Sequence, residues 1–154
     1  MTYNIFRQVT VLPVSTFELN TLWDSTVKLT DWISRRALEL LYTSWDLSPL
    51  AKDCGYDGPP FPWDEERRFE IRCELDAAFF HLYLPSDKDG NWIKAENEND
   101  AQLSELKRHF PTPRDAVSYI LDQFPIVREK DERRFGRFRT KDRILEIYDR
   151  LLPS

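Results

Sequence analysis

Histidine and cysteine are the side chains most often used for acid–base, nucleophilic and metal chemistry, and this chain has two of each. His81 follows Cys73 by eight residues, about two turns of a helix, so a zinc ion would need a third converging ligand. We therefore interpret His81 as a packing histidine, and His109, which lies in a basic string, as a surface residue. Two cysteines are too few for a disulfide framework, so we expect Cys54 and Cys73 to be reduced. No serine stands in the context of a nucleophile elbow.

Two short patterns look like catalytic motifs, but each lacks a part that the chemistry needs. Glu105 and Lys107 have the Glu-x-Lys spacing of metal-dependent nucleases, yet their surroundings predict a helix, without a second acid converging from a strand. Gly58-Pro59-Pro60-Phe61 looks like the Asn/Asp-Pro-Pro-Tyr/Phe loop of amino-methylating DNA methyltransferases. Its glycine has no side-chain oxygen to accept a hydrogen bond from a target amine. We interpret both patterns as structural, so residue chemistry alone predicts no catalytic residue and no metal site.

The composition narrows the class of protein. The chain has 154 residues, of which 41% are hydrophobic and 14% aromatic, and it carries a formal net charge of −5. This length predicts one compact domain, and so many aromatic residues exclude a disordered chain. No apolar run reaches the length of about 18 residues that a membrane span needs. Arg7 and Gln8 interrupt the N-terminal apolar stretch, so we expect no signal peptide there. We expect a cytoplasmic protein with no membrane partner. The four glycines are isolated, so no glycine-rich cofactor loop is predicted.

Charge is distributed unevenly along the chain. Residues 133–143 contain six basic residues and one acidic residue, a local charge of +5, with Phe135 and Phe138 between them. Such a stretch suits contacts to nucleic-acid phosphates. The candidate DNA-binding residues are Arg133, Arg134, Arg137, Arg139, Lys141 and Arg143. Two alternatives stay open: a patch for a protein partner, or a solvated face paired with Glu129, Asp131, Glu132, Asp142 and Glu146.

The hydrophobic periodicity predicts a mainly α fold. Helices are expected over residues 31–44, 63–84, 101–110, 112–124, 125–134 and 140–151. Asp31 and Thr140 are the predicted N-caps of the first and last of these, and Phe124 belongs to the predicted buried stripe of the fourth. A short N-terminal β-strand is expected over residues 3–13, and it needs a partner edge. The Asp89-Gly90 turn allows a β-hairpin near residues 82–94.

Several strings of residues resemble the C-terminal region of large bacterial adenine-specific DNA methyltransferases. These are the single-chain restriction–modification proteins of type IIG and the related methylases of phage-defence systems. The strings are residues 37–47, 54–68, 74–83 and 119–127, the last continuing through 139–148. Gln8-Val9-Thr10-Val11-Leu12-Pro13 is similar to the Lys-Gln-Leu-Pro-Val-Leu-Pro segment that closes target recognition in that family. The resemblance covers nearly the whole chain.

The resemblance implies a non-catalytic part of a larger system. Residues 1–14 would be a strand at the end of the target-recognition segment, and residues 15–154 a compact helical C-terminal domain. S-adenosylmethionine is implied for the full-length family protein, whose catalytic and cofactor loops lie upstream and have no counterpart here, so no cofactor is expected in this chain. The implied partners are double-stranded DNA and the upstream methyltransferase and target-recognition domains. The leading hypothesis is a DNA-binding module of a restriction–modification methyltransferase, and the alternative is a docking module that packs on the methyltransferase or nuclease domains without touching DNA.

Overall fold

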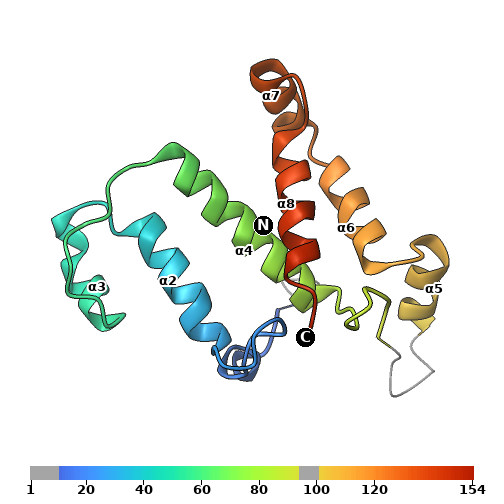
Figure 1. Cartoon of the computed structure of the whole chain (residues 1–154), viewed down its shortest axis with the longest axis horizontal. Helices are drawn as coiled ribbons and strands as arrows, with labels where there is room; N and C mark the ends of the chain where they lie inside the picture. The colour runs from blue at the N-terminus through green and yellow to red at the C-terminus, as the bar shows by residue number, and fades with distance from the viewer. Residues whose placement is uncertain (1–10, 94–100) are drawn as a thin grey trace, which may run out of the picture.

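The computed structural model describes residues 11–93 and 101–154, and it confirms a mainly helical fold (Figure 1). Within these two ranges no helix is both long enough and apolar enough to cross a membrane. The predicted strand over residues 3–13 lies largely outside the described residues, and residues 11–13 form no regular element. The described helices, with η for 3-10 helices, are η1 Val14–Glu18, α2 Leu29–Leu41, η2 Trp45–Leu47, α3 Ser48–Asp53, α4 Glu65–Tyr83, α5 Ala101–His109, α6 Pro113–Asp122, α7 Pro125–Phe135 and α8 Arg139–Arg150.

The longest described helix, α4, is the element around which the others are arranged. Its first turn follows Asp64, whose Oδ1 accepts a hydrogen bond from the backbone N–H of Arg67 at 3.0 Å. Glu65 and Glu66 lie in that turn, where the helix dipole favours negative charge. Figure 1 shows α2 along one side of α4, α8 crossing it on the other, and α6 beside α8.

Local signals in the sequence determine the ends of α6 and α7. Thr112 and Asp115 form a capping box: the Thr112 hydroxyl accepts from the Asp115 N–H at 3.2 Å, and the Asp115 carboxylate accepts from the Thr112 N–H at 3.0 Å. Pro125 is the first residue of α7. Gly136 ends this helix with a φ of +72°, a left-handed conformation that carries no Cβ penalty for glycine. The chain reverses there and enters α8.

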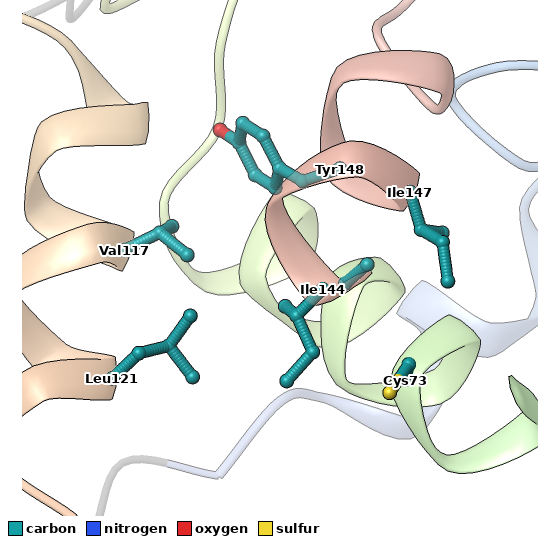
Figure 2. Close-up of a cluster of buried hydrophobic side chains, with 7 residues drawn as sticks. Cys73, Val117, Leu121, Ile144, Ile147 and Tyr148 are labelled. Atoms are coloured by element: carbon teal, nitrogen blue, oxygen red, sulfur yellow. The ribbon is translucent and has the colours of Figure 1, made fainter. Parts of the chain in front are cut away.

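The main hydrophobic core lies where α8 packs against both α4 and α6. Ile144 and Ile147 of α8 are buried together with Tyr148. Figure 2 shows Ile144 between Cys73 of α4 on one side and Val117 and Leu121 of α6 on the other. These residues form a single cluster, with members Cys73, Ala77, Val117, Leu121, Ile144, Ile147 and Tyr148.

A second, smaller core holds together the α2–α3 arm, by which we mean residues 29–63. Leu38, Tyr42 and Ala51 are buried in it, and the rings of Tyr56 and Phe61 pack against them. These two rings stack with centroids 4.9 Å apart, and the Phe61 N–H donates to the Tyr42 carbonyl at 2.8 Å. The proline-rich loop is therefore anchored by its own aromatic residues.

Two predicted N-caps are wrong. The first long helix begins at Leu29 rather than at Asp31, because an isolated bridge between Asn20 and Lys28 fixes the chain just before it. The last helix begins at Arg139 without a side-chain cap from Thr140. The Thr140 N–H instead donates at 2.6 Å to Oδ2 of Asp131, so a carboxylate of α7 satisfies a free donor at the start of α8.

Over residues 82–93, the part of the expected β-hairpin that the structure describes, no paired strands form. Tyr83 closes α4, because helical hydrogen bonding continues until the Leu84 N–H donates to the Phe80 carbonyl at 2.8 Å. The chain then turns at Gly90, and its pairing is a single bridge between Ser86 and Trp92. Trp92 is buried, and its indole N–H donates at 2.9 Å to the carbonyl of Phe110, beyond α5. The returning segment packs on helices instead of extending a sheet.

Candidate interaction surfaces

The six basic residues predicted to contact DNA fall into two groups in the structure. Those at the α7–α8 turn are open to solvent: the side chains of Arg133 and Arg137 are 75% and 68% exposed, and Arg134 is exposed as well. Those on α8 are 18–26% exposed, and they are Arg139, Lys141 and Arg143. Of the six, only the three arginines at the turn are exposed enough to contact a large partner.

Arg139 and Arg143 point from α8 toward α4, where they bind Glu66 and Glu70. The two arginines are four residues apart on α8, and the two glutamates are four residues apart on α4. The same contact therefore repeats after about one helical turn. The Arg139 guanidinium contacts both carboxylate oxygens of Glu66 and lies 4.1 Å from the centre of the Phe69 ring. Arg143 binds Glu70 at two points, one of them an Nε–Oε2 hydrogen bond of 2.7 Å. These cations connect the two central helices.

The other basic residues also bind carboxylates of this chain, with one exception. Lys141 extends from α8 to α6, where its Nζ lies 2.7 Å from Asp122. Among the described residues, Arg134 has no carboxylate at ion-pair distance, and its guanidinium lies 5.0 Å from the Phe135 ring. Three acids named for the paired-face alternative bind these cations, in the pairs Arg133–Glu129 at 2.9 Å, Arg137–Asp142 at 3.5 Å and Arg143–Glu146 at 2.6 Å.

The ion pairs between α4 and α8 keep their acids charged. Hydrogen bonds from Arg143 hold the pKa of Glu70 below its usual value, and those from Arg139 act in the same way on Glu66.

The sequence contained a signal for the interface between α4 and α8 that our sequence analysis did not use. Two acids four residues apart on the longest predicted helix match two arginines four residues apart on the last one.

The residues considered for nucleophilic and metal chemistry lie in surroundings that do not activate them. Cys73 is 1% exposed, and burial raises the pKa of its thiol to about 12, so the reactive thiolate is strongly disfavoured. Cys54 is free and exposed. His81 is fully buried, which confirms the packing interpretation, and His109 is exposed. Within the described ranges, no three His, Cys, Asp or Glu side chains converge to hold a metal ion.

The two motif-like patterns have structural roles. Lys107 lies on α5, as predicted, and its Nζ approaches the Ile93 carbonyl at 3.3 Å, while Glu105 lies 3.6 Å from Arg108. A Cβ at Gly58 would overlap the ring of Tyr56, so close packing explains the glycine. The remaining glycines, Gly55, Gly90 and Gly136, stand singly in turns with positive φ.

Large apolar side chains are exposed along the outer part of the α2–α3 arm. Trp45 and Trp63 are 67% and 63% exposed, although the Trp63 indole N–H donates to Glu65 at 2.8 Å. The exposed set comprises Leu41, Trp45, Leu47, Leu50 and Trp63. Large apolar side chains exposed within one part of a chain are candidates for an interaction site. Our sequence analysis did not single out these tryptophans, although Trp63 directly follows the proline-rich loop.

An apolar groove of about 600 Å³ lies between α4, α6, α7 and α8. Phe79 of α4, Ile120 of α6 and Val127 of α7 line it, and Asp76 is the one charged residue among its described lining. Phe124, predicted to be buried, is 51% exposed beside this groove. That prediction is wrong because the chain turns into α7 at the next residue, so none of the described elements covers the ring.

Comparison with known proteins does not assign this chain to a family. No protein-family model matches the chain, and neither the curated proteins nor the solved structures contain a match. The resemblance to methyltransferase C-terminal regions therefore stays a prediction, drawn from short strings of residues alone.

Proposed function

We propose that this chain is a non-catalytic docking module that packs on other domains of a bacterial restriction–modification methyltransferase. One observation carries the proposal: the α2–α3 arm exposes Trp45 and Trp63 by about two thirds of their surface. Tryptophan is enriched among the few interface residues that supply most of the binding free energy, because it buries a large apolar area with little loss of side-chain freedom. The arm therefore has the composition of a protein interface.

The basic stretch supports the same choice. Half of the predicted DNA-binding residues bind carboxylates on α4 and α6, and a phosphate would have to displace those carboxylates. The resemblance to methyltransferase C-terminal regions suggests the partner, namely the upstream methyltransferase and target-recognition domains. S-adenosylmethionine belongs to that partner in this proposal.

Binding of the arm can be measured with the methyltransferase polypeptide encoded immediately upstream of this chain. We expect the double variant Trp45→Ala/Trp63→Ala to bind at least about 30-fold more weakly than the native chain, which corresponds to about 2 kcal/mol for interface hot spots. Isothermal titration calorimetry measures the affinity. The control is Ile126→Ala, which removes a 68% exposed side chain outside the arm and should leave the affinity unchanged. The absence of such a reading frame, no binding, or equal losses in both variants would count against docking.

A second candidate function is contact with the DNA backbone through the α7–α8 turn. The observation in its favour is the cluster of exposed cations there, Arg133, Arg134 and Arg137; among the described residues, Arg134 has no carboxylate at ion-pair distance. In this proposal the module positions the methyltransferase on the duplex without reading its sequence, because contacts to phosphates carry no base information.

A salt titration of duplex binding tests this second function. The logarithm of the binding constant should fall linearly with the logarithm of the salt concentration, and changing Arg133, Arg134 and Arg137 to glutamine should reduce the slope by about 3. A matched triple, Lys28→Gln/Lys52→Gln/Arg108→Gln, removes the same charge from exposed positions elsewhere and should change the slope little. No binding at low salt, or identical slopes for both triples, rejects DNA contact by the turn.

A further inference from the structure

A small polar cleft of about 250 Å³ lies where the first turns of α4 and α8 meet the last turns of α7 (Figure 1). Its described lining includes four basic side chains, which come from all three helices: Arg72, Lys130, Arg134 and Arg139. The same lining includes three acids, namely Glu65, Glu66 and Asp131. Cations therefore outnumber acids on a concave surface, and this arrangement favours an anion.

The acids of the cleft are occupied by donors of this chain. Both carboxylate oxygens of Glu66 contact an arginine of α8. Asp131 accepts a hydrogen bond from the Thr140 N–H at 2.6 Å, and Glu65 accepts one from the Trp63 indole N–H at 2.8 Å. Because each carboxylate has a donor of its own, none of the three acids neutralises the remaining cations of the cleft.

The basic side chains are largely unpaired. Arg72, Lys130 and Arg134 are exposed, and among the described residues none of them has a carboxylate at ion-pair distance. Asp76 acts on Arg72, and Glu66 on Arg134, only at longer range. These three cations therefore keep their hydrogen-bond donors for a ligand, whereas Arg139 serves to neutralise Glu66.

Aromatic rings hold two of the guanidinium groups in place. Those of Arg134 and Arg139 lie 5.0 and 4.7 Å from the centre of the Phe135 ring, and that of Arg139 also lies 4.1 Å from the centre of the Phe69 ring. A guanidinium group that is already positioned loses less conformational freedom when it binds a ligand. Its planar fork of N–H donors matches the oxygens of a phosphate or a carboxylate.

The size of the cleft restricts the kind of anion. Pockets for drug-sized ligands have volumes of about 300–1,000 Å³, so this cleft suits a compact charged group. A phosphate monoester carries nearly two negative charges at neutral pH and three acceptor oxygens, which match three unpaired cations. It also ends in its phosphoryl group, which can enter a small cleft while the rest of the ligand stays outside. A phosphate diester carries a single charge and continues on both sides.

We propose that the cleft between α4, α7 and α8 binds the phosphoryl group of a phosphate monoester through Arg72, Lys130 and Arg134. The site differs from the surface considered above for contact with the DNA backbone, because Arg133 and Arg137 are absent from its described lining. It is also separate from the α2–α3 arm, so it does not depend on the proposed docking function.

Titration with inorganic phosphate at about pH 8, where the dianion predominates, tests the site. We expect saturable shifts of the backbone amide NMR signals around the cleft, at constant ionic strength, with a dissociation constant on the order of 1 mM. Arg72→Gln/Lys130→Gln should weaken binding at least about tenfold, because charge-assisted hydrogen bonds are lost. The control Arg133→Gln/Arg137→Gln removes the same charge from exposed side chains of the α7–α8 turn and should weaken binding less than about twofold.

Far-UV circular dichroism identifies a variant that fails to fold. In that case Lys130→Gln alone, at an exposed position of α7, replaces the double variant and should weaken binding about threefold. The absence of saturable shifts overturns the proposal, and so do equal losses in the cleft variant and the turn variant. The cleft variant keeps every arginine of the turn, so its result is independent of DNA contact by the turn and of docking by the arm.

A second comparison identifies the source of the monoester. The native chain is titrated with a DNA duplex that has terminal phosphates and with the same duplex that has terminal hydroxyls. Tighter binding of the phosphorylated duplex, lost in Arg72→Gln/Lys130→Gln, supports the site and assigns it to the end of a DNA chain. Equal binding of the two duplexes by a chain that binds inorganic phosphate supports the site and assigns it to a small phosphorylated molecule.

Discussion

Ile144→Ala is expected to lower the free energy of unfolding by about 2–5 kcal/mol. Ile144 is 1% exposed, and it lies at the centre of the core in Figure 2, between Cys73 of α4 and the α6 residues Val117 and Leu121. Truncation removes three carbon atoms from contact with two helices at once. The neighbouring helices are held by their own caps and ion pairs, so they collapse only partly into the cavity.

The matched control for this substitution is Ile126→Ala. The same atoms are removed, but Ile126 is 68% exposed on the first turn of α7, so the change in unfolding free energy should stay within about 0.5 kcal/mol. Urea unfolding followed by circular dichroism measures both variants. Similar losses at the two sites would show that α8 is not the centre of the core.

Ion pairs and apolar packing contribute unequally to the interface between α4 and α8. The Arg143–Glu70 pair is about one quarter exposed on both sides, so solvent screening limits it to about 1 kcal/mol. The buried face of α8 contributes several times more, since each large side chain removed from water is worth about 1.5–3 kcal/mol. The paired arginines therefore mainly determine how α8 is placed along α4, while the core supplies the stability.

The parts of the fold that sequence predicted well are those specified by neighbouring residues. Thr112 and Asp115 form a capping box within a single turn, and Gly136 ends a helix through its own backbone conformation. Asp64 likewise caps α4 within two residues of the predicted start. Such interactions join positions three or four apart, so their pattern is readable without knowledge of the tertiary structure.

The missed features depend on contacts between distant segments. The start at Leu29 depends on the Asn20–Lys28 bridge, and Phe124 is exposed because of where α7 goes rather than because of its own position in the helical stripe. The basic stretch shows the same limit. Their spacing of four residues puts Arg139 and Arg143 on one helical face, but only the packing of α8 on α4 shows that this face meets two glutamates.

We expect His81 to make the stability of the fold sensitive to mild acid. Its ring is 0% exposed and stacks on Tyr148 with centroids 3.8 Å apart, and its Nε2 lies 2.9 Å from the Tyr148 carbonyl oxygen. A carbonyl only accepts, so Nε2 carries the hydrogen of the neutral ring and Nδ1 is the site of protonation. Among the described atoms Nδ1 has no hydrogen-bond partner. Protonation would therefore place an unpaired charge in the core.

The pH dependence of stability follows from this environment. Burial lowers the pKa of His81 below its usual value of 6.5, and only the Tyr148 carbonyl and Asp149 act in the opposite direction. As the pH falls through 6.5, the unfolded chain binds a proton that the folded chain excludes, so the free energy of unfolding decreases. The slope of the free energy of unfolding against pH should approach about 1.4 kcal/mol per pH unit. This is roughly the value for one group that is protonated in the unfolded chain and stays neutral in the folded chain.

Urea unfolding at several pH values between 5 and 7 measures this slope. The window lies above the range in which Glu66 and Glu70 lose their ion pairs, because the pKa values of both acids are lowered from 4.5. His81→Gln keeps a hydrogen-bond donor but cannot be charged, so the slope should disappear whatever the absolute stability of the variant. His109→Gln changes the exposed histidine and should leave the slope intact. A slope that persists in His81→Gln would assign the acid sensitivity to another group.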